Sequence, residues 1–279
     1  MSPSPVVLRC RDKTVDLTRP VVMGVLNVTP DSFSDGGRFL DADAAVRHGL
    51  AMAEEGAALI DVGGESTRPG AAPVDTAEEL RRVVPVIERL RSATAAVICV
   101  DTSKAEVMRA AAAAGAGLIN DVRALREPGA LDAARESGCA VCLMHMQGEP
   151  RTMQVAPVYG DVVTEVKAFL AERVHSCRAA GLPAEGLVID PGFGFGKTLE
   201  HNLTLLRRLG ELTAGALPVM VGLSRKSMVG KLTGRAEGER LNGSVVLAVI
   251  AALAGARIVR AHDVAATVEA LKLVAAVRG

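Results

Sequence analysis

The feature that most constrains the fold of this chain is an alternation, repeated eight times, of a short apolar segment with a longer helical pattern. The apolar segments are rich in β-branched residues and span 21–27, 58–62, 96–101, 118–121, 139–144, 187–190, 218–222 and 257–261. Most are continuous rather than alternating, which is typical of parallel strands covered on both faces. Because strand–helix–strand crossovers are right-handed, such a chain folds either as an open doubly wound sheet or as a closed barrel.

The segments between the predicted strands carry helix signals. Asp75 can cap a helix with Glu78 as its capping-box partner, and apolar residues from Leu80 to Leu90 recur at helical spacing. Eight such units in 279 residues, without a Pro-, Gly- or Ser-rich linker, favour a single-domain α/β fold, the (β/α)8 TIM barrel. We expect residues 1–20 to form an N-terminal extension with a short hairpin, and residues 21–279 to form the barrel.

Composition excludes several classes of partner. Lys and Arg total 32 and Asp and Glu total 32, so no global field attracts nucleic acid or an anionic membrane. The longest apolar run, 245–254, is far shorter than a membrane-spanning helix, and the first 20 residues hold no apolar segment of a secretory signal. Five scattered cysteines indicate a reducing, cytoplasmic environment, and we expect Cys139 and Cys142 to be buried on opposite faces of a strand.

The predicted strands all end in polar residues, at the edge where a parallel barrel binds its ligand. Asp101, Asn120 and Asp190 end three of them. Their carboxylates and amide suit the edge of a flat nitrogen heterocycle, because a carboxylate can accept two parallel hydrogen bonds. Polar groups are costly to bury without a task, so eight such ends indicate a binding site rather than helix caps alone.

Cationic and hydrogen-bond-donating side chains form a second group, suited to an anion such as phosphate. They are Arg68, Lys226, Arg260 and His262. Arg260 and His262 are two residues apart on a strand, so both point to the same side. The two groups together predict a ligand with a nitrogen heterocycle at one end and phosphate at the other.

The glycine-rich segment 192–198 resembles a P-loop but has three residues, not four, between Gly192 and Gly196. We interpret it as a tight turn in which glycine lets the backbone approach a ligand. No His, Cys, Asp or Glu cluster of the sequence has metal-cage spacing. We therefore expect any metal to be Mg²⁺, held jointly by a protein oxygen and substrate phosphates.

Several long motifs resemble the signatures of the dihydropteroate synthase family. They are NVTPDSFSDGG (27–37), DVGGESTRPG (61–70), VDTSK (100–104), IND (119–121), LMHMQG (143–148), DPGFGFGK (190–197), SRKS (224–227) and RAHD (260–263). The resemblance covers nearly the whole chain in order. It implies a transferase of folate biosynthesis that condenses 6-hydroxymethyl-7,8-dihydropterin diphosphate with p-aminobenzoate, releasing diphosphate. It also implies a (β/α)8 barrel, a homodimer and a target of sulfonamides.

The resemblance further implies roles for individual residues. The pterin ring is expected to contact Asp101, Asn120, Asp190 and Lys226. The diphosphate is expected to lie beside Thr67, Arg68, Arg260 and His262. The p-aminobenzoate pocket is expected to include Phe33, Arg68, Pro69 and Ser227. Mg²⁺ is expected at Asn27. Val122, Met144 and Phe195 are expected to sandwich the ring, and the catalytic roles are expected at Asp101, Lys226, Arg260 and His262.

Two alternatives share the barrel and the pterin pocket. A pterin-dependent methyltransferase has no need of the loops at 27–33 and 66–69, which the family uses for p-aminobenzoate. A non-catalytic pterin-binding paralogue should have lost loop or diphosphate residues, whereas Arg68, Lys226 and His262 are all present.

Overall fold

Eight parallel strands make up the main sheet. They are β3 (Val21–Asn27), β4 (Leu59–Gly63), β5 (Val97–Asp101), β6 (Leu118–Asp121), β7 (Ala140–Met144), β8 (Leu187–Asp190), β9 (Met220–Gly222) and β10 (Ile258–Ala261). Their order is β8-β7-β6-β5-β4-β3-β10-β9, and one parallel bridge between Ile189 and Val219 joins β8 to β9. The sheet is therefore a nearly closed TIM barrel, as predicted. The computed structural model describes residues 7–28, 38–66, 73–149 and 152–278.

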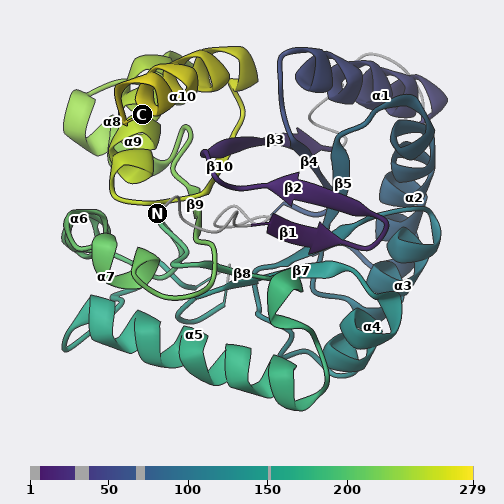
Figure 1. Cartoon of the computed structure of the whole chain (residues 1–279), viewed down its shortest axis with the longest axis horizontal. Helices are drawn as coiled ribbons and strands as arrows, with labels where there is room; N and C mark the ends of the chain where they lie inside the picture. The colour runs from purple at the N-terminus through teal and green to yellow at the C-terminus, as the bar shows by residue number, and fades with distance from the viewer. Residues whose placement is uncertain (1–6, 29–37, 67–72, 150–151, 279) are drawn as a thin grey trace.

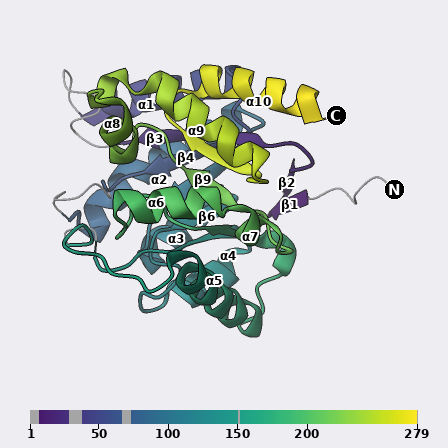
Figure 2. The same cartoon turned by 90° about the vertical axis from the view of Figure 1, so that its left-hand side faces the viewer.

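The helices surround this barrel (Figures 1 and 2). They are α1 (Arg38–Glu54), α2 (Thr76–Ala93), α3 (Ala105–Ala113), α4 (Ala130–Ser137), α5 (Val162–Ala179), α6 (Leu199–Arg207), α7 (Gly210–Thr213), α8 (Ser227–Thr233), α9 (Leu241–Leu253) and α10 (Val264–Arg278). All eight predicted strands are present. Those at 21–27, 118–121 and 187–190 have the predicted bounds, and the others differ by one or two residues at an end.

Helix α2 shows how local chemistry sets an element's bounds. The side chain of Asp75 accepts a hydrogen bond from the backbone N–H of Glu78 at 2.7 Å, as its N-cap position predicts. The inward face includes Val83, Val86 and Leu90, together with the fully buried Glu79. The buried stripe is thus rotated from the predicted one and contains a carboxylate.

A two-stranded hairpin of β1 (Val7–Cys10) and β2 (Lys13–Asp16) lies across one end of the barrel (Figure 1). Its buried side chains Leu8, Cys10 and Val15 pack in one cluster with inward-facing residues of the barrel strands. Those residues come from the amino-terminal halves of the strands, so the hairpin closes the end opposite the predicted site. The predicted N-terminal hairpin is therefore present.

The cysteines are all free and buried. Cys142 belongs to the cluster inside the barrel, whereas Cys139 packs with the residues between strands and helices. The two thiols thus lie on opposite faces of the sheet, as their spacing predicts.

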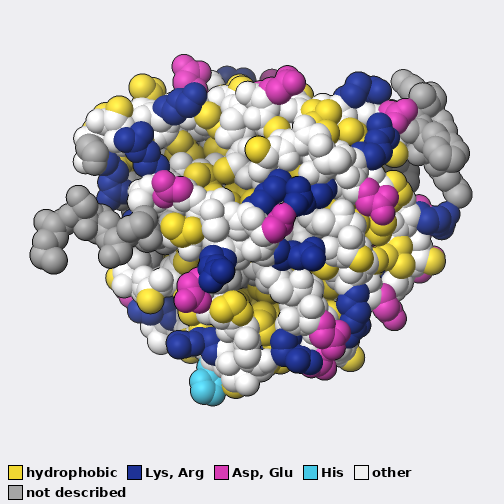
Figure 3. Space-filling view, turned by 45° about the vertical axis from the view of Figure 1, so that its right-hand side comes forward, with side chains coloured by type: hydrophobic (Ala, Val, Ile, Leu, Met, Phe, Trp, Pro, Cys, Tyr) yellow, Lys and Arg dark blue, Asp and Glu magenta, His cyan; other side chains and the backbone are white. Residues whose placement is uncertain are grey.

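Basic and acidic side chains are interspersed over the face shown in Figure 3, consistent with their equal totals. Among the described residues, no helix is both long and apolar enough to cross a membrane.

Candidate functional site

The strand register places the predicted site residues side by side. Asn27 is paired with Gly63, Gly63 with Asp101, and Asp101 with Asn120, across four neighbouring strands. A side chain at Gly63 would contact both Asn27 Oδ1 and Asp101 Oδ2, so these two oxygens converge above this glycine. The ends of β3, β4, β5 and β6 therefore form one continuous polar layer.

Arg260 connects this layer to β10. Its Nε donates to Asp61 Oδ2 at 2.6 Å, and its Nη2 donates to Asp101 Oδ2 at 2.8 Å. Asn120 Nδ2 also donates to Asp61 Oδ2, at 2.9 Å. Asp61 is fully buried, and its Oδ1 has no hydrogen-bond partner in the structure. No role is predicted for Asp61 from the sequence, although a carboxylate inside an apolar strand indicates a buried polar contact.

Electrostatics in this cluster favour a carboxyl group that titrates near neutrality. Burial, followed by repulsion from Asp61, raises the pKa of Asp101 to about 7, while Arg260 opposes the shift. The physical cause is that a low-dielectric site disfavours a second negative charge beside the first.

The opposite side of the barrel mouth holds Asp190 and Lys226. Asp190 Oδ1 accepts from the backbone N–H of Gly192 at 2.7 Å. Lys226 Nζ donates to the carbonyl of Phe193 and lies 4.7 Å from the ring centroid of Phe195. Burial lowers the pKa of Lys226 to about 8, with Asp190 partly offsetting this effect.

Apolar side chains lie beside these charges. Val122 and Met144 form a small buried cluster with Met146 and Met153, and Phe195 packs against it. The three residues expected to sandwich a flat ring are therefore brought together, at the carboxyl ends of β6, β7 and β8.

The glycine-rich turn after β8 is pressed against the segment that follows β7. Gly192 and Gly196 both have positive φ, and a Cβ at either would overlap a backbone carbonyl oxygen, that of His145 or of Gln147. The close approach that these glycines permit is thus to the chain's own backbone.

The remaining predicted residues lie at or beyond the rim. His262 Nδ1 is 3.1 Å from Ser224 Oγ, and Ser227 is exposed at the first position of α8. Phe33, Thr67, Arg68 and Pro69 lie outside the described residues.

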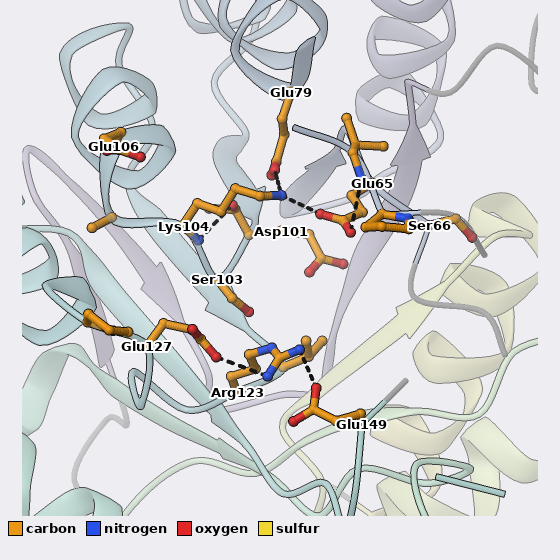
Figure 4. A pocket seen from close by; sticks show the side chains of 16 residues that line it. Glu65, Ser66, Glu79, Asp101, Ser103, Lys104, Glu106, Arg123, Glu127 and Glu149 are labelled. Atoms are coloured by element: carbon orange, nitrogen blue, oxygen red, sulfur yellow. Dashed lines mark hydrogen bonds and ion pairs between the residues drawn. The ribbon is translucent and has the colours of Figure 1, made fainter. Parts of the chain in front are cut away.

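A cavity of about 640 Å³ opens beside Asp101, between the loops that precede α2, α3 and α4 (Figure 4). On one wall, Lys104 forms ion pairs with both Glu65 and the fully buried Glu79. On the opposite wall, Arg123 forms ion pairs with two further glutamates (Figure 4). The ion pairs of Lys104 are not predicted from the sequence, because Glu79 lies one position before the apolar residues that predict α2.

Comparisons with known proteins agree on one family. The family model described as "Pterin binding enzyme" matches residues 23–262. The dihydropteroate synthase of Escherichia coli K12 is 56% identical over 263 residues, covering 94% of this chain and 93% of that protein.

Solved structures give the same result. The Xanthomonas albilineans dihydropteroate synthase with 4-aminobenzoic acid is 55% identical, with a TM-score of 0.94 and coverage of 99% of both chains. The Yersinia pestis dihydropteroate synthase with a sulfonamide drug complex is also 55% identical, with a TM-score of 0.93, covering 98% of this chain and 99% of that one.

Proposed function

The chain belongs to the dihydropteroate synthase family, and from this premise we propose how its residues bind and activate the two substrates. It is a transferase that joins 6-hydroxymethyl-7,8-dihydropterin diphosphate to p-aminobenzoate, forming 7,8-dihydropteroate and releasing diphosphate. The observation that carries the residue assignment is the polar layer at the strand ends. In it, Asp101 and Asn120 are in register, and Arg260 is hydrogen-bonded to Asp101 directly and to Asn120 through Asp61.

The pterin ring is proposed to lie across the barrel mouth. Asp101 and Asn120 on one side and Asp190 on the other offer acceptors for the ring's N–H groups. Lys226 offers a donor for its carbonyl and ring nitrogen, and its Nζ already lies at this edge beside Phe195. The cluster around Met144 supplies apolar contact for the ring faces.

Arg260 and His262 are proposed to bind the diphosphate. An Arg side chain has five N–H donors, and two of those of Arg260 contact Asp61 and Asp101. The others remain for phosphate oxygens, so Arg260 can bind the anion and still be held by the carboxylates. Thr67 and Arg68 are assigned to the diphosphate by the family resemblance alone.

Mg²⁺ is proposed to bind at Asn27. The amide oxygen of Asn27 converges with Asp101 Oδ2 above Gly63, and such hard oxygen donors fit Mg²⁺. Within the described residues, no three Asp, Glu, His or Cys side chains form a metal cage. We propose that diphosphate and water supply the other ligands. When bound, the ion would stabilise negative charge on the leaving diphosphate.

The proposed reaction is a dissociative displacement. The bond between C9 of the pterin and the diphosphate oxygen breaks, and the electron pair leaves with diphosphate. The Asp101 carboxylate stabilises the positive charge that develops on the pterin, and Arg260 with His262 stabilises the departing anion. The aniline nitrogen then forms the new bond to C9 and loses a proton. Because an aniline needs no strong base, holding it beside C9 supplies much of the rate.

The p-aminobenzoate pocket is proposed at the rim, with Ser227 near the benzoate carboxylate and Phe33, Arg68 and Pro69 around the ring. The Yersinia pestis relative is solved with a sulfonamide drug complex. We propose that sulfonamides compete with p-aminobenzoate in this protein as well.

The decisive experiment is turnover of purified protein with both substrates, with Mg²⁺ and with EDTA. We expect diphosphate and dihydropteroate in equal amounts, strong dependence on Mg²⁺, and loss of turnover in Asp101→Asn with an unchanged melting temperature. Pterin binding without turnover would instead identify the non-catalytic paralogue. Turnover of Asn27→Ala at the wild-type Mg²⁺ requirement would remove Asn27 from the metal site.

A homodimer and a cytoplasmic location complete the proposal. Helices α9 and α10 pack side by side and expose Val246, Ile250, Leu253, Leu273 and Val277. Arg278 Nη1 donates to the carbonyl of Ala252, so the carboxyl ends of both helices contribute to one apolar face. A surface of this kind marks an interaction site, and the family resemblance assigns it to a second copy of the chain.

A further inference from the structure

Lys197 is a buried amine that the reaction outlined above does not use, and burial lowers its pKa well below the usual lysine value, with Asp190 partly offsetting this effect. Its exposed fraction is 2%, and its Nζ contacts uncharged acceptors: the carbonyls of Gly192 at 2.9 Å and Phe195 at 3.0 Å, and His145 Nδ1 at 2.9 Å. Burying an ammonium group is costly unless it is fully hydrogen-bonded. A methionine would fill the same volume without that cost, so the buried amine and its hydrogen bonds need an explanation.

The partners of Lys197 define what it holds. Two are carbonyls of the turn 192–196, and the other two are the imidazole and, at 3.5 Å, the backbone carbonyl of His145, which follows β7. Burial followed by the nearby charge of Lys197 lowers the pKa of His145 to about 3, so the imidazole is neutral and its Nδ1 can accept from the lysine. Lys197 thus ties the turn after β8 to the end of β7.

The other carbonyls of the same turn are also bound by side chains. The carbonyl of Gly194 accepts from Gln154, and that of Gly196 accepts from Tyr159 at 2.8 Å. The carbonyl of Phe193 accepts from Lys226. Every carbonyl from 192 to 196 therefore faces a donor, and the two lysines together bind three of these five carbonyls.

Lys226 is in close contact with this turn. A Cβ on Gly194 would lie 3.2 Å from Lys226 Cδ, and the Lys226 ammonium lies over the Phe195 ring. The position of Lys226 Nζ is consequently set by the position of the turn, and the turn is anchored from its far side by Lys197.

We propose that Lys197, together with His145, is a positioning residue that holds the turn 192–196 and thereby places Lys226 for the pterin ring. The proposal rests on the pterin-binding role assigned to Lys226 above. To reach a pterin, Lys226 must exchange the carbonyl of Phe193 for the substrate. Because Lys197 anchors the turn, the turn stays in place during this exchange. Only the Lys226 side chain then has to move for its Nζ to reach the substrate.

The test compares Lys197→Met with Lys226→Met, the double variant, and the exposed control Lys167→Met on α5. We expect Lys197→Met to raise KM for pterin diphosphate about tenfold, the size of one lost hydrogen bond to a charged group, with a much smaller change for p-aminobenzoate. The double variant should be no worse than Lys226→Met, because the two residues act in series. Lys197→Gln, which keeps a donor, should restore part of the loss.

The pH profile separates positioning from stability. In Lys197→Met, the alkaline limb of kcat/KM should move upwards from about 8, because a loosened Lys226 is better solvated. A lower melting temperature with an unmoved limb and an unchanged pterin KM would overturn the proposal and leave Lys197 a purely structural residue.

The experiment distinguishes failure of the positioning role of Lys197 from failure of the pterin-binding role of Lys226. If Lys226→Met raises the pterin KM and Lys197→Met does not, only the positioning role is wrong. If Lys226→Met leaves the pterin KM unchanged, the assigned role of Lys226 is wrong, and the positioning role fails with it. Should Lys197→Met be insoluble, Lys197→Gln is compared with the wild type instead: it should raise the pterin KM by less than tenfold, and an unchanged pterin KM would overturn the positioning role.

Discussion

Arg260 Nη2 donates to Asp101 Oδ2 at 2.8 Å, so the cation assigned to the diphosphate and the carboxylate assigned to the pterin are bonded to each other. In the proposed binding mode, the two ends of one substrate therefore contact one connected cluster, with Asp61 as its buried third member. A substitution of Asp101 should therefore also affect diphosphate binding, and a substitution of Arg260 should also affect pterin binding.

The pH dependence of kcat/KM should be bell-shaped. Asp101 must be ionised to stabilise the positive charge that develops on the pterin, so activity rises with pH through its pKa of about 7. Lys226 must be protonated to donate, so activity falls as pH passes its pKa of about 8. The acid limb belongs to a group with a raised pKa and the alkaline limb to one with a lowered pKa, which leaves a narrow optimum. Initial rates from pH 5.5 to 9.5 measure both limbs, and a rate independent of pH between 6 and 9 would contradict the assignment.

Arg260→Ala should weaken binding of pterin diphosphate by roughly 100-fold or more, the usual cost of truncating one partner of a buried charge pair. Binding of a pterin without phosphates should weaken far less. Calorimetry with both ligands makes the comparison, and Arg207→Ala, at an exposed ion pair on α6, serves as the control. Equal losses for the two ligands would remove Arg260 from the anion site.

Gly192→Ala should destabilise the fold more than Gly138→Ala. Both glycines have nearly the same φ, 66° and 65°, so both substitutions meet the same backbone strain of about 1 kcal/mol. A Cβ at position 138 meets open space, whereas one at 192 overlaps the carbonyl of His145. Urea unfolding should therefore separate the two variants, and Gly192→Ala should also raise the pterin KM. Equal stabilities would show that the turn yields without cost.

Ile250→Glu should convert a dimer into a monomer, since it places a charge in the exposed apolar face of α9. Sedimentation velocity at several concentrations measures this, with Val155→Glu as a matched control because Val155 is 77% exposed on a different surface. Dimer formation by Ile250→Glu at wild-type affinity would place the interface elsewhere.

Strand positions and strand-end chemistry could be predicted from the sequence because they follow from local pattern. Continuous apolar runs fix where parallel strands lie, and parallel strands bring their carboxyl ends to one edge. Asp101, Asn120, Asp190 and Arg260 were therefore identified, and the register places Asp101 and Asn120 side by side as expected.

The partners of these residues could not be predicted in the same way, because they depend on contacts between distant segments. Asp61 and Arg260 form their hydrogen bond although they are 199 positions apart in the sequence. Glu79 forms its ion pair with Lys104 because the buried face of α2 begins at Glu79, one position before the apolar residues that predict this helix. The sequence places Lys197 only in a glycine-rich segment that resembles a P-loop. Its hydrogen bond to His145 depends on the packing of the turn 192–196 against the segment after β7.

The hairpin of β1 and β2 has a consequence for the order of events. Because the hairpin covers the amino-terminal end of the barrel with Leu8, Cys10 and Val15, we expect substrates and products to enter and leave at the opposite end. The proposed pterin contacts at Asp101 and Asn120 lie at the strand ends, whereas Ser227 is exposed at the rim. We expect p-aminobenzoate to enter second and to cover the pterin beneath it. Initial-rate kinetics should therefore show a compulsory order of binding, with pterin diphosphate first. A random order would mean that bound p-aminobenzoate does not block the entry of pterin diphosphate.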